Sequence, residues 1–274
     1  MISEIRQEKM NRRDWLQSIC CGFALARVTK AEPTESVNFL TTIAVEVKRA
    51  FSTPGPQPNG LQATREGLWV LDQQTNRVAL LDYADGKVLR EFGTEADRGS
   101  GITFDGSALW LASTYNCLIL RVDPKNGRTL KQFSSPGSGL VKWGPRSEHP
   151  SPTGAHGLEF SRNELWAAVP PSATIYVMNP DSGEVLRSLP APGIRPHGIG
   201  WDPDGALWCT ESNYRSFFKM SRQNGKILKQ VLLPPTRPQV DGMVVVPHGM
   251  TIWDNQFWFC VAETAEIYRF LIPG

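Results

Sequence analysis

The sequence has little excess charge, few histidines and no long apolar run, and these absences exclude several classes of function. Twenty-nine Lys and Arg residues against 27 Asp and Glu residues leave a formal net charge of +2. This balance provides no basic surplus that would favour nucleic acid or an anionic membrane. No apolar stretch approaches the roughly 20 residues that a membrane-spanning helix needs. We therefore expect neither a nucleic-acid partner nor a membrane span.

Cysteine is also scarce. The chain has five cysteines, and two of them lie side by side near the N-terminus. The other three are Cys117, Cys209 and Cys260, and an odd number is a poor basis for a disulfide framework. We expect them to be small buried apolar side chains, with a Cys209–Cys260 bridge as the alternative.

The N-terminus resembles an export signal. The stretch NRRDWLQ (Asn11–Gln17) has the paired arginines, the aromatic residue and the leucine of a twin-arginine motif. A short, weakly polar stretch follows, and small residues stand at the −3 and −1 positions of a cleavage after Ala31. Residues 1–31 are therefore predicted to be a signal peptide of a periplasmic or secreted protein, with Met10 as a possible start. The alternative is an amphipathic N-terminal helix.

A repeat of about 41 residues runs through the rest of the chain. Each unit begins with a glycine followed by an apolar residue, and a tryptophan follows nine or ten residues later. The glycines are Gly60, Gly101, Gly157, Gly198 and Gly249. Each unit predicts four short strands joined by Gly-containing turns. Four strands in about 40 residues are typical of a β-propeller blade.

The last unit has only three predicted strands. The stretch RAFSTPG (Arg49–Gly55) matches KQFSSPG (Lys131–Gly137), which closes the second unit. We therefore expect the N-terminal strand to complete the last blade and to remove the open sheet edges. The prediction is an all-β fold, a single β-propeller domain over residues 32–274 with five four-stranded blades. The alternative is a sixth, degenerate blade within Ser138–Thr153 or Ser36–Gly55.

Three of the four histidines directly precede a repeat glycine: His156, His197 and His248. The first strand of a propeller blade lines the central channel, so these side chains are expected to converge at the channel mouth. The first two units have Asn59 and Ser100 at the same position. The turn itself therefore does not require histidine.

Two carboxylates, Glu211 and Glu263, stand near the end of the second strand in the last two units, which returns to the same face. Together with the three histidines they predict a ligand set for a divalent cation, Mg²⁺ or Zn²⁺. Alternatively, one histidine is a general base that a carboxylate orients. His156, Asn59 and Arg195 are the expected substrate contacts. A third possibility is that the imidazoles only cap backbone groups.

Two of these units resemble a known family. RPHGIGWDPDGALWCTE (Arg195–Glu211) and VPHGMTIWDNQFWF (Val246–Phe259) are similar to blades of the virginiamycin B lyase, or streptogramin lyase, family. The resemblance implies a β-propeller with lyase activity on a small molecule. This chain departs from that family in its predicted number of blades, five instead of seven. It also departs in the predicted export, since the lyases act in the cytoplasm.

The resemblance also implies roles for particular residues. His248 matches the catalytic base and His197 matches a substrate-contacting histidine. Glu263, four residues before Ile267, matches a Mg²⁺ ligand. The family's second Mg²⁺-linked glutamate falls at Val246, so the family's metal site is broken or rebuilt in this chain.

Three functions follow as alternatives. The first is an exported lyase-like propeller, a carbon–oxygen lyase or a metal-dependent hydrolase, that acts on or binds a small molecule with or without a divalent cation. The second is a non-catalytic ligand- or protein-binding propeller, and the third is a tri-histidine metalloenzyme of another reaction type. We expect a monomer. The insertion Ser138–Gly154, with Trp143, Arg146 and His149, is either a lid over the channel face or plain decoration.

Overall fold

The computed structural model describes residues 42–144, 151–234, 239–240, 243–244 and 246–273. These residues all belong to one compact unit, Leu40–Gly274. Apart from two short 3-10 helices, η1 (Pro170–Ser172) and η2 (Ala262–Thr264), its regular structure is strand. Within the described ranges, no helix has the length and apolar character needed to cross a membrane. The predicted signal peptide lies outside the described residues.

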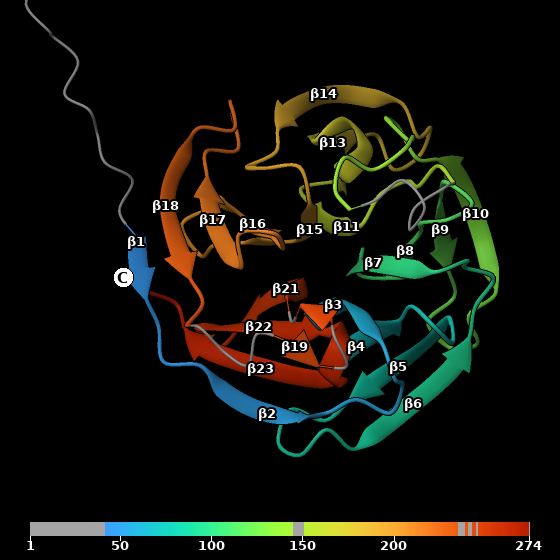
Figure 1. Ribbon diagram of the computed structural model, residues 1–274. Coiled ribbons are helices and arrows are strands. Elements are labelled where there is room, and N and C mark those ends of the chain that lie inside the picture. The colour runs from blue at the N-terminus through green and yellow to red at the C-terminus, as the bar shows by residue number, and fades with distance from the viewer. Residues whose placement is uncertain (1–41, 145–150, 235–238, 241–242, 245, 274) are drawn as a thin grey trace, which may run out of the picture. The chain divides into compact units, whose positions relative to one another are not determined.

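Five sheets with four antiparallel strands each surround a central axis (Figure 1). Each of the first four blades is built from one repeat unit. Blade 1 consists of β3 (Pro58–Thr64), β4 (Gly67–Asp72), β5 (Arg77–Leu81) and β6 (Val88–Gly93). Blade 2 consists of β7 (Gly99–Phe104), β8 (Leu109–Ser113), β9 (Leu118–Val122) and β10 (Thr129–Ser134). Blade 3 consists of β11 (Gly157–Ser161), β12 (Glu164–Val169), β13 (Thr174–Met178) and β14 (Val185–Pro190).

The last two blades complete the ring, and a two-stranded hairpin precedes the fifth. Blade 4 consists of β15 (Pro196–Trp201), β16 (Leu207–Glu211), β17 (Ser216–Met220) and β18 (Ile227–Leu232). The hairpin consists of β19 (Gln239–Val240) and β20 (Met243–Val244). Blade 5 consists of β21 (Pro247–Trp253), β22 (Gln256–Val261), β23 (Glu266–Leu271) and, from the N-terminal side, β2 (Lys48–Ser52). The predicted five-bladed all-β propeller is therefore confirmed.

The N-terminal strand closes the ring as predicted. In β2, Phe51 lies opposite Ile267 of β23, in an antiparallel pairing. The structure adds one strand that the sequence did not predict: β1 (Thr42–Ala44) pairs in parallel with the outer edge of β18. Its Ile43 packs against an apolar cluster that blades 4 and 5 share. The described residues of Ser36–Gly55, one of the two segments considered for a sixth blade, thus extend blade 4 and complete blade 5.

The repeat glycines let the five inner strands converge on the axis. A Cβ atom on Gly157 would overlap the carbonyl oxygen of His197 in the next blade, and one on Gly249 would lie 2.5 Å from the carbonyl oxygen of Asn59. The space that the inner strands enclose has no room for a water molecule. The glycine is therefore a packing requirement of the ring.

The five repeat tryptophans fill the contacts between blades. Each is at most 2% exposed, and Trp69, for example, packs with Ile102 and Leu111 of the following blade. A cation from strand 3 or 4 of the same blade lies over each indole ring. These cations are Arg90, Arg121, Arg187, Lys219 and Arg269.

A buried carboxyl group lies two residues along β11 from its repeat glycine. Glu159 is 7% exposed, and its Oε1 accepts hydrogen bonds from the backbone N–H of Phe160 at 3.1 Å and from the Thr103 hydroxyl at 3.4 Å. Burial raises the pKa of Glu159 to about 8 against these two hydrogen bonds. The folded protein therefore holds this carboxyl group protonated at neutral pH.

We expect Glu159→Gln to make the protein more resistant to alkali. Because the pKa of Glu159 is higher in the folded chain than in the unfolded one, its contribution to stability is lost as pH rises from about 4.5 to about 8. The loss is about 1.4 kcal/mol per pH unit, and glutamine, which needs no proton, avoids it. Urea unfolding at pH 5 and pH 8 measures the difference. Parallel pH profiles for wild type and variant would contradict the assignment, and the exposed Glu184→Gln is the control.

Candidate functional site

The three histidines meet side by side at the inner strands of blades 3, 4 and 5. All three are buried, with exposed fractions of 2% to 6%. The ring centroids of His156 and His197 are 4.8 Å apart, and those of His197 and His248 are 4.9 Å apart. Each pair of rings is nearly perpendicular, at 87° and 84°. The repeat register therefore does bring these side chains together.

The hydroxyl group of Ser212 determines the proton positions on two of these rings. Ser212 donates its only proton to the carbonyl oxygen of Pro247 at 2.6 Å, so it accepts a hydrogen bond from Nδ1 of His197 at 2.9 Å. The Nε2 atom of neutral His197 then carries a lone pair, and it accepts from Nδ1 of His156 at 3.1 Å. Both nitrogens of His197 are thus engaged.

His248 presents an unprotonated nitrogen to a carboxyl group. Its Nδ1 lies 3.0 Å from the carbonyl oxygen of Val246, which can only accept, so Nδ1 carries the proton of the neutral ring. Its Nε2 lies 3.9 Å from Oε1 of Glu263. Burial first, and then the charge of Arg195, lowers the pKa of His248 to about 3. Burial, the neighbouring imidazoles and Arg195 likewise hold the pKa of His197 well below its ordinary value.

Within the described residues, Arg195 and Glu263 are charged groups that act on the histidines. The guanidinium of Arg195 lies over the Trp143 ring at 5.2 Å, and Trp143 meets His156 edge-on at 5.9 Å. Burial lowers the pKa of Arg195, while the carboxylates of Glu263 and Glu211 raise it. Burial raises the pKa of Glu263, against backbone hydrogen bonds and the charge of Arg195. The contacts of Trp143 show that the insertion after blade 2 reaches the site. Arg146 and His149 of the same insertion lie outside the described residues.

Glu211 holds the backbone instead of facing the imidazoles. Its two carboxylate oxygens accept hydrogen bonds from the backbone N–H groups of Arg195 at 2.7 Å and Tyr214 at 2.9 Å. In blade 1, which has no histidine, Asp72 accepts from the backbone N–H of Gln57 at 2.6 Å in the same way. The sequence contained a signal for this structural role of Glu211, because blade 1 has a carboxylate, Asp72, at the same position but no histidine.

The divalent cation is harder to place. Among the residues that the structure describes, no three His, Cys, Asp or Glu side chains are arranged to hold a metal ion. His197 uses both nitrogens within the protein, and the oxygens of Glu211 bind backbone N–H groups. Asn59, in blade 1 next to blade 5, accepts a hydrogen bond at Oδ1 from the Ser100 hydroxyl at 2.7 Å. The residues do not fit a metal in this arrangement, so the cation stays a prediction.

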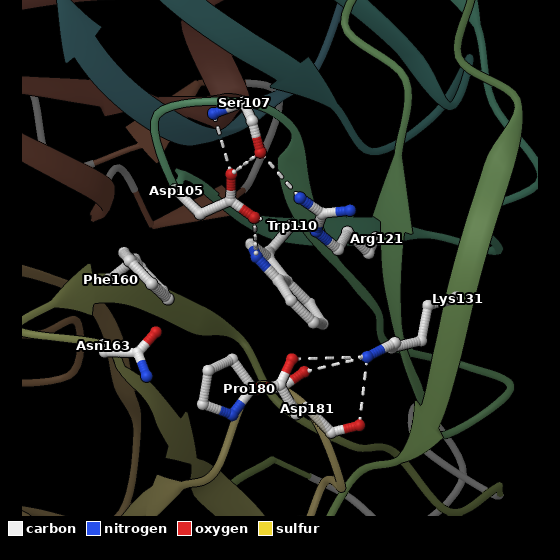
Figure 2. Close-up of a pocket in the computed structure, with 9 residues that line it drawn as sticks. All are labelled: Asp105, Ser107, Trp110, Arg121, Lys131, Phe160, Asn163, Pro180 and Asp181. Atoms are coloured by element: carbon white, nitrogen blue, oxygen red, sulfur yellow. Dashed lines mark hydrogen bonds and ion pairs between the residues drawn. The ribbon is translucent and has the colours of Figure 1, made fainter.

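A hollow of about 290 Å³ lies between blades 2 and 3, away from the histidines (Figure 2). Its walls include two cations, but Arg121 binds the Asp105 carboxylate at 2.8 Å. Lys131 donates to the backbone carbonyl of Asp181 at 3.0 Å. The first contact lies within blade 2 and the second ties blade 2 to blade 3, where the Asp181 carboxylate also lies 3.8 Å from Nζ of Lys131. Both cations therefore have an acidic partner. The histidine cluster therefore remains the candidate functional site.

No protein-family model matches the chain, and the comparison with curated proteins finds no match. Solved structures do match. Myxococcus xanthus glutaminyl cyclase has a TM-score of 0.66 at 9% identity, over 86% of this chain and 100% of that one. A streptogramin B lyase has a TM-score of 0.50 at 17% identity, over 83% and 98% of the two chains. The chain is thus a five-bladed β-propeller that is similar in fold to glutaminyl cyclase and streptogramin lyase propellers.

Proposed function

We propose that the histidine cluster is a general acid–base site that acts on a small molecule, with a lyase-type elimination as the reaction. One observation carries the proposal: the unprotonated Nε2 of His248 faces Glu263 in a buried setting beside the cation Arg195. The solved propellers that are similar in fold include a lyase. That likeness supports the reaction class by analogy only.

Burial makes Glu263 the more basic of the two groups. It lowers the pKa of the imidazole to about 3 and raises the pKa of the carboxyl group. A proton that Nε2 of His248 takes from a substrate can therefore pass to Glu263 at little cost. His248 relays the proton, and Glu263 holds it.

The elimination then balances within the site. His248 removes a proton from carbon, the electron pair forms a double bond, and the neighbouring carbon–oxygen bond breaks. The half-buried guanidinium of Arg195 stabilises the negative charge that develops on the leaving oxygen. Glu263 returns the proton to that oxygen. His197, with both nitrogens engaged, is a positioning residue that orients His156.

We further propose that the mature protein is exported and acts on its substrate as a monomer. The N-terminal pattern of residues 1–31 supports export. Folding before translocation, which a twin-arginine signal implies, suits a ring whose closure needs both ends of the propeller.

We expect His248→Asn to lower turnover at least 100-fold and Glu263→Gln at least 10-fold, because each removes one half of the proton relay. Asparagine keeps an N–H donor for Val246 but offers no basic nitrogen. The assay incubates purified protein with small lactones and cyclic depsipeptides at pH 7 and detects the eliminated product by mass spectrometry. Tyr214→Phe, at an exposed side chain, is the control.

Unchanged turnover in folded His248→Asn would overturn the proposal. Binding of panel members without turnover by the wild type would also overturn it, and would favour a binding propeller. Circular dichroism and thermal unfolding of each variant separate loss of chemistry from loss of fold.

A further inference from the structure

Arg195 is a cation whose side chain is only partly paired within the protein. Its backbone is fixed, since its N–H donates to Glu211 and its carbonyl oxygen accepts from the Ser212 N–H at 3.2 Å. The side chain makes a long contact of 3.5 Å from Nη1 to Asn213 and lies over the Trp143 ring. Its Nε is buried and has no hydrogen-bond partner among the described residues. A buried donor on a charged group is costly unless a partner is supplied.

Glu263 shows the complementary deficit. Its Oε1 faces His248, while its Oε2 is buried and has no hydrogen-bond partner within the described part of the chain. The side chain is 12% exposed, so solvent has little access to either oxygen. Arg195 and Glu263 also act on each other electrostatically. The mouth therefore holds one unused donor on a cation and one unused acceptor in the same neighbourhood.

We propose that the ligand of this site is a small carboxylic acid with an N–H donor close to its carboxylate, such as an N-acylated amino acid or a peptide C-terminus. The carboxylate binds the Arg195 guanidinium, and the N–H group donates to Oε2 of Glu263. This assignment rests on the proposed function, because elimination from a lactone releases a carboxylate, and the ligand is then the leaving group that Arg195 stabilises at the same site.

The charge balance selects a monoanion. Among the residues that the structure describes, Arg195 is the cation that acts on His197 and His248, and Glu211 and Glu263 both act on it electrostatically. A phosphate dianion would meet these two carboxylates with only one cation to offset them. A cationic ligand would meet Arg195. The guanidinium lies over the Trp143 ring, 5.2 Å from its centroid, and a guanidinium group suits the planar, two-oxygen recognition of a carboxylate.

The test uses N-acetylglycine, N-acetylleucine and N-acetylphenylalanine, each paired with its methyl ester, which keeps the N–H donor and removes the charge. Isothermal titration calorimetry at pH 7 measures affinity for the wild type, Arg195→Gln, Arg195→Lys and the exposed control Arg162→Gln. We expect at least one acid to bind at least 10-fold more tightly than its ester. The preference disappears in Arg195→Gln, is reduced in Arg195→Lys and is unchanged in the control.

Three results would overturn the assignment. The first is equal affinity for acids and esters, and the second is no binding of either up to 20 mM, roughly the weak end of specific small-ligand affinity. The third is an undiminished preference in folded Arg195→Gln. The result separates this inference from the proposed function. Acid-selective binding that persists in His248→Asn, without turnover in the wild type, keeps the ligand class and rejects the elimination. Turnover that depends on His248 but shows no acid preference does the reverse.

Discussion

Gly198→Ala is expected to lower the free energy of unfolding by more than about 3 kcal/mol, whereas Gly200→Ala, two residues along the same strand, should change it by less than about 1 kcal/mol. The difference follows from what each new methyl group meets. A Cβ on Gly198 would overlap the backbone nitrogen of Met250 and lie 2.9 Å from the Cα atom of Gly249. Neither backbone atom can move without displacing blade 5.

Gly200 is a matched control because its side of the strand faces a flexible group. A Cβ there would come within 3.0 Å of the terminal methyl group of Met250, which can rotate away. Urea unfolding of both variants, followed by tryptophan fluorescence, measures the effect. Equal losses of stability would show that the close approach of the inner strands at the axis is not what requires the glycine.

Acidification from pH 6.5 to pH 5 is expected to destabilise the fold through His197 and His248. Burial keeps the pKa of His248 at about 3 and that of His197 well below its ordinary value. The unfolded chain therefore binds protons in this range that the folded chain does not bind, and stability falls as pH falls. Each histidine contributes about 1.4 kcal/mol per pH unit. Glu159 and Glu263, whose pKa values are raised, act in the opposite direction.

Because the histidines and the glutamates change stability in opposite directions as pH falls, a histidine variant is needed to isolate the contribution of His248. His248→Asn should reduce the acid sensitivity by about 1.4 kcal/mol per pH unit between pH 6.5 and pH 5. Chemical unfolding at pH 8, 7, 6 and 5 provides the profile. Above pH 7 the difference between wild type and variant should be constant, which is the internal control. A constant difference down to pH 5 would mean that His248 is protonated in the folded protein.

The fold could be predicted because the repeat carries its own register. A glycine and a tryptophan at nearly constant spacing mark each blade, and the match of Arg49–Gly55 to the end of another unit predicts the closing strand. The three residues of β1 carry no turn signal and no alternation, and Thr42 pairs with Gln230, 188 residues away. Such a pairing depends on an exposed sheet edge that no local pattern reveals.

The candidate site could be predicted only in outline. Strand register is enough to place His156, His197 and His248 together. It does not determine how the rings turn about their side-chain torsions, and this decides whether three imidazoles converge on one ion or bind each other. The Ser212 hydroxyl, which sets the proton positions, follows Glu211 directly in sequence but was not singled out, because a serine after a strand is ordinary.

The pairing of β2 with β23 also has a consequence for biosynthesis. Arg49 and Glu266 of these strands are 217 residues apart. At about 5 to 20 residues per second, the ribosome needs roughly 10 to 40 s to make the chain between them. During that time β2 of the nascent protein is unpaired because β23 has not been made, and blade 1 lacks its contact with blade 5. A stalled or truncated chain therefore displays a sheet edge that chaperones and proteases can recognise.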